Sequence, residues 1–185
     1  MICSSLRRSG TLGLDLAIRV GTTLEQESTH PYCDYVVPHL QRVHTLSLEF
    51  RVSRLPFSNM PQLMKLRHLY IWGSSPENPI FPSCTNSSLG TFHFNSHTAL
   101  QFASIPTSRL RDVDICRYCV DEEIAYFINK CNNLQVLTLR VDDWAPDVII
   151  SSVTLTHLDV LTEILLVALL GNLPNLRHLR LHIFD

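Results

Sequence analysis

Histidine and aspartate side chains recur near the end of the chain at a spacing that could hold a metal ion. They are His157, Asp159, His178 and His182. On neighbouring strands they would be close enough to share a zinc ion, which imidazole binds well, or to form a pH-sensitive surface. Histidine also replaces polar surface residues readily, as in the similar Arg-His-Leu runs at 67–69 and 177–179. We therefore interpret these histidines as surface residues and predict no metal site.

A CxxC sequence, Cys116-Arg117-Tyr118-Cys119, is the second chemical candidate. Zinc binding would need a second pair of ligands, and only Cys131 follows at a comparable spacing. A thioredoxin-type activity would need the first cysteine at the N-terminus of a helix, whereas this motif falls at the end of a predicted strand. The two cysteines are therefore interpreted as structural or incidental. The six cysteines follow no disulfide framework, which indicates a reducing, intracellular compartment, the cytoplasm or the nucleus.

Several classes of function are excluded by motif, charge and hydropathy. There is no Gly-rich phosphate loop, Gly-x-Ser-x-Gly elbow or His-Glu-x-x-His sequence, so we predict neither an enzyme nor a cofactor. The 15 basic and 17 acidic residues are mixed, and no Lys/Arg block could neutralise a run of phosphates, so nucleic acid is not an expected partner. The longest apolar run, residues 164–170, is far shorter than the ~20 residues that cross a bilayer, so no membrane partner is expected.

The elements that position these residues follow from the pattern Leu-x-x-Leu-x-Leu, which returns seven times with hydrophobic substitutes. Its last position recurs after 21 to 24 residues, within the period of leucine-rich repeats. The seven triplets are Val43/Leu46/Leu48, Leu66/Leu69/Ile71, Leu89/Phe92/Phe94, Leu110/Val113/Ile115, Leu134/Leu137/Leu139, Leu155/Leu158/Val160 and Leu176/Leu179/Leu181. This pattern predicts an α/β leucine-rich-repeat solenoid, a horseshoe with a parallel β-sheet on the concave face and irregular or helical returns on the convex face.

The chain divides into two predicted parts. Residues 1–39 are an N-terminal strand and capping segment, because residues 11–20 alternate between apolar and polar as a half-buried strand does. Residues 40–185 are about seven leucine-rich repeats. Helical returns are predicted at 121–131, with Asp121 as the N-cap, and at 162–170. No polar capping repeat follows the last predicted strand, so we expect either a fragment or a stack covered at that end by something else.

Three stretches resemble one family. Residues 6–16 (LRRSGTLGLDL) resemble the stretch that follows the F-box in proteins of a type expanded in mushroom-forming fungi, and residues 38–48 (PHLQRVHTLSL) resemble the first repeat of that family. Residues 121–137 (DEEIAYFINKCNNLQVL) are similar to the helix-to-strand segment of F-box leucine-rich-repeat proteins. Gly13 stands where that family usually has proline, and the F-box itself, a helical segment expected upstream, is absent from this sequence.

This resemblance implies a non-enzymatic protein-protein interaction module, the substrate-recognition repeats of an F-box-type ubiquitin-ligase receptor. A Skp-type adaptor would be a partner only if an upstream F-box exists. A second family is the alternative: residues 63–69 (LMKLRHL) resemble repeats of plant nucleotide-binding immune receptors. The N-terminal stretch has no counterpart in that family, so this reading ranks second.

The polar residues between the inward leucines are predicted to face the concave surface in columns that run from strand to strand. Eight of them are the predicted partner-binding residues: His68, Tyr70, Trp72, His93, Asp114, Arg140, Asp159 and Arg180. Tyr70 and Trp72 are the leading candidates, because exposed aromatic residues are preferred anchors of binding sites. The alternative is that a neighbouring loop, such as the proline-rich segment 76–82, covers them.

The predicted strand face measures about 450 Å², which is below the ~800 Å² per partner of a standard interface. We therefore expect a protein or peptide on the concave face. A folded partner would also have to contact the loops at the rim of the sheet.

Overall fold

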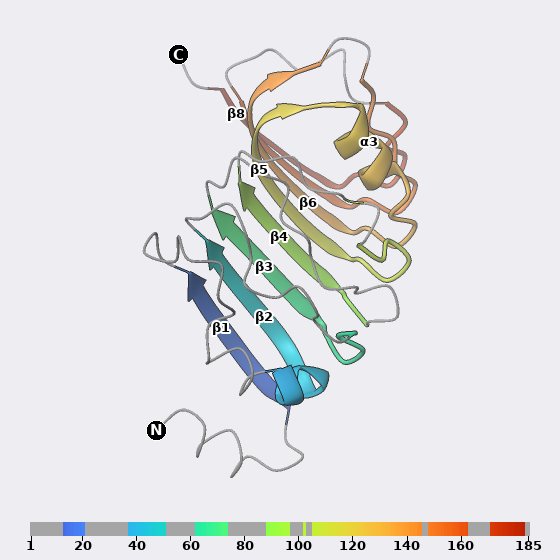
Figure 1. Ribbon diagram of the computed structural model, residues 1–185. Coiled ribbons are helices and arrows are strands. Elements are labelled where there is room, and N and C mark those ends of the chain that lie inside the picture. Colours follow the sequence, from blue (N-terminus) through green and yellow to red (C-terminus); the bar gives the residue numbers. More distant parts are fainter. Residues whose placement is uncertain are drawn as a thin grey trace.

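The computed structural model describes residues 13–20, 37–50, 62–73, 88–96, 102, 105–145, 148–162 and 171–183. These residues form one parallel sheet of eight strands, which follow one another in sequence order (Figure 1). The strands are β1 Leu14–Val20, β2 Val43–Phe50, β3 His68–Gly73, β4 Thr91–Ser96, β5 Asp112–Val120, β6 Val136–Trp144, β7 His157–Thr162 and β8 His178–Ile183. The sheet confirms the predicted parallel-sheet solenoid, whereas the leucine-rich-repeat type stays a prediction.

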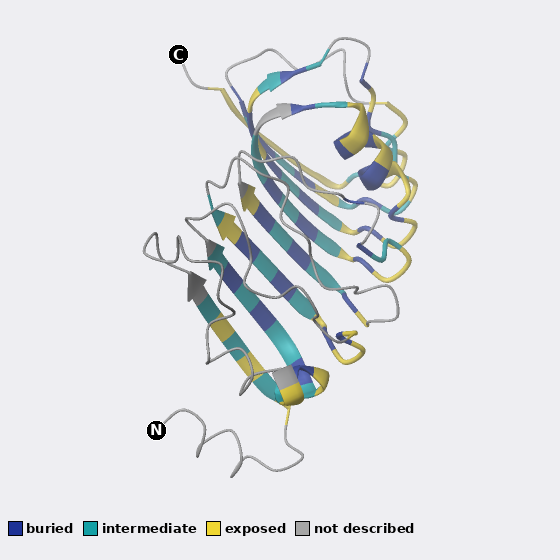
Figure 2. Ribbon diagram, viewed as in Figure 1, coloured by how far each residue is buried: buried dark blue, intermediate teal, exposed yellow. Residues whose placement is uncertain are grey.

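The hydrophobic triplets of the repeats form the core on one face of the sheet. Successive side chains of a strand point to opposite faces, so the Leu-x-Leu spacing directs its members to the same side. All members of the first six triplets are at most 2% exposed. The buried residues therefore run as bands across the sheet from β2 to β7 (Figure 2).

Backbone hydrogen bonds set the register where each strand begins. The amides of Gly90 and Thr91 both donate to the carbonyl oxygen of Arg67, at 2.9 and 3.1 Å. The amides of Arg111 and Asp112 donate in the same way to Gly90, and the pair of bonds recurs in the next three repeats. The repeat spacing and the strand register therefore agree from β3 to β8.

The predicted helix at 121–131 is α3, Glu122–Asn129. Asp121 is its N-cap, as predicted: its Oδ1 accepts a hydrogen bond from the amide of Ile124 at 3.0 Å. Glu122 and Glu123 lie in the first turn, where negative charge favours the helix dipole. A 3₁₀ helix, η1 Val37–Arg42, precedes β2.

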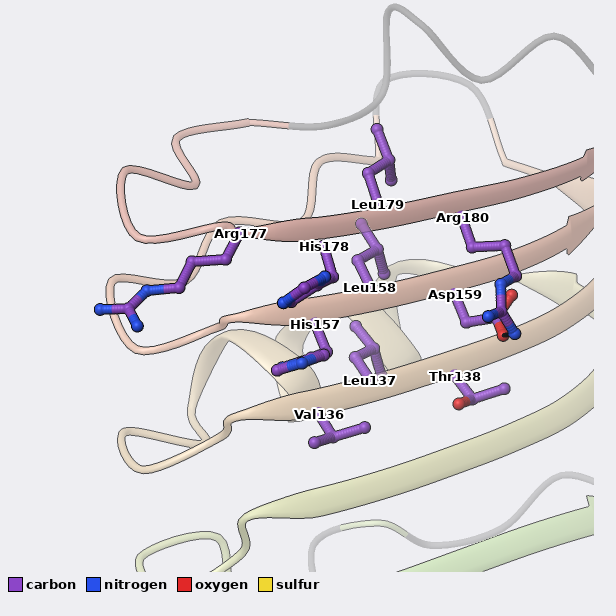
Figure 3. Close-up of a pocket in the computed structure, with 10 residues that line it drawn as sticks. All are labelled: Val136, Leu137, Thr138, His157, Leu158, Asp159, Arg177, His178, Leu179 and Arg180. Atoms are coloured by element: carbon purple, nitrogen blue, oxygen red, sulfur yellow. Dashed lines mark ion pairs between the residues drawn. The ribbon is translucent and has the colours of Figure 1, made fainter.

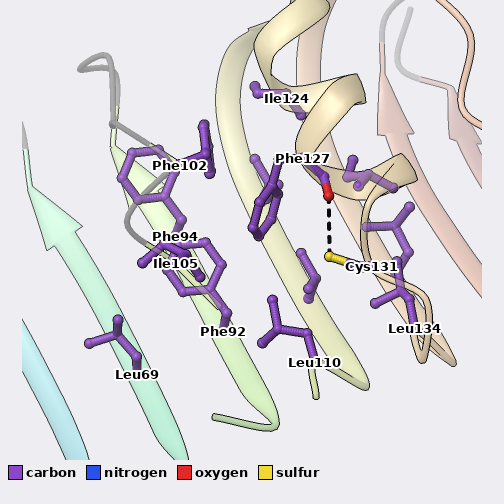
Figure 4. Packing of buried hydrophobic residues seen from close by; sticks show 14 of the residues in the cluster. Leu69, Phe92, Phe94, Phe102, Ile105, Leu110, Ile124, Phe127, Cys131 and Leu134 are labelled. Atoms are coloured by element: carbon purple, nitrogen blue, oxygen red, sulfur yellow. Dashed lines mark hydrogen bonds between the residues drawn. The ribbon is translucent and has the colours of Figure 1, made fainter. Parts of the chain in front are cut away.

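The buried face of α3 packs on an aromatic cluster in the middle of the sheet (Figure 4). The Phe127 ring lies edge-on to Phe92, with ring centroids 5.8 Å apart, and 4.8 Å from Phe102. Cys131 is buried in the same region, and its thiol donates a hydrogen bond to the carbonyl oxygen of Phe127 at 3.2 Å. Burial raises the pKa of this thiol to about 12, so Cys131 acts as an apolar side chain.

The two ends of the sheet differ from its middle. β1 confirms the predicted N-terminal strand over residues 14–20, and its apolar side chains are half-buried against the core. At the other end, the apolar side chains of β8 are exposed. The helix predicted at 162–170 lies outside the described residues except for Thr162, which is buried at the end of β7. In the described segments, no helix is long and apolar enough to cross a membrane.

Candidate functional site

The face of the sheet opposite the buried leucines, called the open face below, carries the columns that the repeat spacing predicts. His68 pairs with Thr91 and Tyr70 with His93 in the register of β3 and β4. The later strands continue the same register: Asp114 pairs with Thr138. All eight predicted partner-binding residues therefore lie on the open face, although their role in binding stays a prediction.

Five of these residues form a continuous row of contacts across β3, β4, β5 and β6, called the aromatic-ionic row below. The Tyr70 ring stacks on Trp72 and on His93, with ring centroids 5.7 and 4.7 Å apart. His93 Nδ1 lies 3.3 Å from Asp114 Oδ2, which also accepts a hydrogen bond from Arg140 Nη2 at 3.0 Å. The structure thus joins residues from four repeats: Tyr70, His93 and Asp114 share one predicted column, and Trp72 and Arg140 belong to the next.

The aromatic end of this row is accessible. Trp72 is 37% exposed, and Tyr70 is half-buried. The segment 76–82, which was the predicted alternative cover, lies outside the described residues.

Asp114 is the electrostatic centre of the row. Its Oδ2 contacts the side chains of both Arg140 and His93. Its Oδ1 is buried and accepts no hydrogen bond from any residue that the structure describes. A buried acceptor without a donor is costly, so Oδ1 reduces the stability that the contacts of Asp114 contribute. Burial raises the pKa of the neighbouring Asp112, and Asp114 adds to the rise, while His93 and His68 oppose it.

A second group of predicted residues lies on β7 and β8. Arg180 Nη1 is 3.5 Å from Asp159 Oδ2, while His182 Nε2 is 3.8 Å from Asp159 Oδ1, too far for a hydrogen bond. The rings of His157 and His178 stack face to face with centroids 4.3 Å apart. Their nitrogens therefore do not converge, and within the described segments no three His, Cys, Asp or Glu side chains are grouped as metal ligands.

A shallow groove of about 470 Å³ lies on the open face between two columns of β6, β7 and β8 (Figure 3). One column holds His157 and His178, and the other holds Asp159 and Arg180. The two columns are two residues apart along each strand, and the leucine between them points to the opposite face of the sheet. The groove offers hydrogen-bond donors and acceptors, from histidine, arginine, aspartate and threonine side chains.

The CxxC sequence lies within β5, and Cys116 is in the middle of that strand. Burial raises the pKa of the Cys116 thiol, although Arg140 opposes the rise. The backbone continues as strand, with Cys119 paired to Asp143, so the first cysteine is not at a helix N-terminus. The position lacks the features that activate a redox thiol.

A larger groove, about 680 Å³, lies where β3, β4 and β5 begin, and the sequence did not predict it. Its lining residues are Arg67, His68, Ser88, Gly90, Ser108, Arg109, Arg111 and Asn133. The repeat pattern drew attention to positions between the leucines, whereas seven of these residues precede the strands. A signal was present: arginine recurs two positions before the central hydrophobic residue of a repeat at Arg67, Arg111 and Arg177.

Comparison with known proteins adds no family to this description. No protein-family model matches the chain, and neither a curated protein nor a solved structure is detectably similar to it. The resemblance to F-box leucine-rich-repeat proteins therefore rests on the sequence motifs alone.

Proposed function

We propose that the chain is a non-enzymatic interaction module that binds a protein or peptide on its open face. In this proposal the repeats are leucine-rich repeats, and they are the substrate-recognition region of an F-box-type ubiquitin-ligase receptor inside the cell. The observation that carries the binding proposal is the aromatic-ionic row, Trp72-Tyr70-His93-Asp114-Arg140, which crosses four strands without a gap.

The chemistry of this row suits the recognition of a polypeptide. Tyrosine, tryptophan and arginine are the residues that most often dominate binding energy. Stacking holds Tyr70 between Trp72 and His93, so little side-chain entropy remains to be lost on binding.

The length of the row sets the size of the ligand segment. Three strand spacings of about 4.8 Å give ~14 Å from β3 to β6, which matches about four residues of extended chain at ~3.3 Å each. A short linear segment of the partner is therefore the expected ligand.

The ubiquitin-ligase part of the proposal is supported by the resemblance at residues 6–16, 38–48 and 121–137. It predicts that the genomic reading frame upstream of Met1 encodes an F-box, and that the longer product co-purifies with a Skp-type adaptor. A nucleotide-binding domain in that frame would instead favour the plant-type immune receptor.

Peptide display provides the test of the open face. Peptides are selected on the wild-type protein, and their affinities are measured by fluorescence anisotropy for wild type and for the double variant Tyr70→Ala/Trp72→Ala. We expect the double variant to lose at least about tenfold in affinity, as truncation of binding anchors does. Its thermal unfolding, followed by circular dichroism, should change little.

Tyr126→Ala is the matched control. Tyr126 is an exposed aromatic residue on the outer side of α3, away from the open face. We expect it to leave the affinity unchanged. Parallel losses of affinity and thermal stability in Tyr70→Ala/Trp72→Ala would make these residues structural and would contradict the proposal.

A further inference from the structure

The outer edge of β8 carries apolar side chains that lie in water. Leu179, Leu181 and Ile183, on the core side of this strand, are 51%, 42% and 50% exposed. The residues paired with them on β7 are at most 2% exposed. Leu179 continues the line of Leu137 and Leu158 across the sheet (Figure 3), yet all of β8 is exposed (Figure 2). The core face of the sheet is therefore uncovered at this edge.

The backbone groups of the same three residues point away from the sheet. The amide of His178 donates to the carbonyl oxygen of Thr156 at 3.0 Å, so the backbone groups of His178 are directed toward β7. Successive residues of a strand direct these groups to opposite sides, so those of Leu179, Leu181 and Ile183 are directed away from β7. Within the described residues, β8 pairs with β7 and with no strand on its other side.

The sequence of β8 does not block further pairing. Natural edge strands avoid it by means of proline, lysine, a β-bulge or a charge on the buried side. Residues 178–183 (HLRLHI) contain neither proline nor lysine, and their register with β7 is regular. Arg180 lies on the open face and leaves the core side apolar. This edge can therefore accept another strand.

We propose that β8 pairs with β8 of a second copy of this chain, antiparallel across a two-fold axis, so that the dimer has one continuous sheet. The axis passes beside Leu181, perpendicular to the sheet, which keeps the apolar side chains of both copies on one face. Leu181 then lies opposite Leu181 of the second copy, and Leu179 lies opposite Ile183. The apolar side chains that are exposed in one copy cover each other in two.

Hydrogen bonding and charge both favour this register. Leu179, Leu181 and Ile183 all form hydrogen-bonded pairs in it, because theirs are the backbone groups that point outward. A shift by two residues leaves one of the three opposite no residue of β8, and in one direction it places Arg180 opposite Arg180, where like charges repel. In the proposed register Arg180 lies opposite His182, and it keeps its own Asp159 at 3.5 Å.

The size of the contact predicts a weak dimer. One strand with three half-exposed apolar side chains per copy buries less than the ~800 Å² per partner of a standard interface. We therefore expect dissociation in the micromolar range, so that β8 stays exposed in dilute solution. In the dimer the two open faces lie on the same side of one sheet, where a partner with two linked segments can bind both.

Sedimentation equilibrium of the full chain measures the association. Between about 1 and about 200 μM, the average mass should rise from the monomer toward the dimer and no further. Leu181→Lys places two like charges opposite each other at the axis and should abolish the rise. Met64→Lys is the matched control, because Met64 is 59% exposed and precedes β3, and it should leave the rise unchanged. Circular dichroism checks that both variants fold.

Engineered cysteines test the register, and they remain informative if Leu181→Lys does not fold. Arg180 and His182 would face each other as a non-hydrogen-bonded pair, in which the side chains of antiparallel strands are closest. An equal mixture of Arg180→Cys and His182→Cys, oxidised with oxidised glutathione, should therefore yield a disulfide between positions 180 and 182, identified by peptide mass spectrometry. Arg180→Cys alone should yield several-fold less of the disulfide between two positions 180.

Three results would overturn the inference. The first is a chain that stays monomeric up to about 200 μM. The second is association that survives Leu181→Lys, or a disulfide between two positions 180 in place of the one between 180 and 182. The third is growth beyond the dimer, which indicates a head-to-tail contact. No peptide ligand enters these measurements, so their outcome is independent of the proposed function.

Discussion

Two almost identical segments of the chain have opposite environments. Residues 67–71 read RHLYI and enter β3, and residues 177–181 read RHLRL and enter β8. On β3, Leu69 is 1% exposed and Ile71 is fully buried. On β8, Leu179 is 51% exposed and Leu181 is 42% exposed. The same local pattern therefore has its apolar side chains in the core on β3 and at the surface on β8.

The difference arises from neighbours and not from the segment itself. In a solenoid each repeat buries its apolar side chains against the repeats on its two sides, and β3 lies between β2 and β4. β8 is the last strand of the described sheet and pairs with β7. The polar positions follow the same rule: Tyr70 is stacked between two rings, whereas Arg180 extends from β8 and is 70% exposed.

The largest effect should come from truncating the equivalent leucines of the two segments. Leu69→Ala should lower the free energy of unfolding by about 2–5 kcal/mol, because it leaves a cavity in the core. Leu179→Ala should lower it by less than about 1 kcal/mol, because half of that side chain is already in water. Urea denaturation of both variants measures the difference, and similar losses would show that β8 is covered in solution.

The ion pairs of the two regions should differ by a smaller amount. Asp114→Asn should cost about 1 kcal/mol, because this half-buried carboxylate accepts a hydrogen bond from Arg140. Asp159→Asn should cost less than about 0.5 kcal/mol, because its partner Arg180 is largely exposed to solvent. Urea denaturation at two salt concentrations provides the measurement. Equal costs would mean that burial of Asp114 does not strengthen its pairing.

The smallest effect is a dependence on pH that arises from Asp112 in the β3–β5 region. Asp112 has a raised pKa through burial, so the folded state holds its proton more tightly than the unfolded state. Stability is therefore lost as the pH rises from the ordinary value of 3.8 through the folded pKa. Asp112→Asn removes this loss and should raise the melting temperature slightly at pH 7.

The control for this prediction is the same melting-temperature measurement at a pH below 3.8. Below pH 3.8 the wild-type carboxyl is protonated in both states, so the gain from Asp112→Asn should vanish there. A gain of the same size at both pH values would point to packing or hydrogen bonding of the amide and not to ionisation.

Prediction from the sequence succeeded where the contacts are local or periodic. The N-cap Asp121 and the helix after it follow from residues within one turn of each other. The columns of the open face follow from the recurring triplet pattern, because parallel strands in constant register align equivalent positions. The assignment to a leucine-rich-repeat family is untested by any of these contacts.

Prediction was incomplete where side chains from different repeats meet. The repeat period places Tyr70 beside His93 in a column. It does not predict that the two rings stack, or that Asp114 Oδ2 contacts both His93 and Arg140. Those outcomes depend on side-chain rotamers, which the neighbours select. The groove where β3, β4 and β5 begin was missed for a related reason, since it needs Gly90 to be small between two arginines from different repeats.

The sequence by itself determined the direction of each strand residue, the stacking order of the strands and the position of α3. These features depend on alternation, repeat length and capping, which are readable along the chain. Only the tertiary structure decided that the leucine of one Arg-His-Leu run is buried and that of the other exposed, and that basic residues from different repeats line one groove. The physical reason is that burial and charge density are sums over neighbours in space, and those neighbours lie a full repeat apart in the chain.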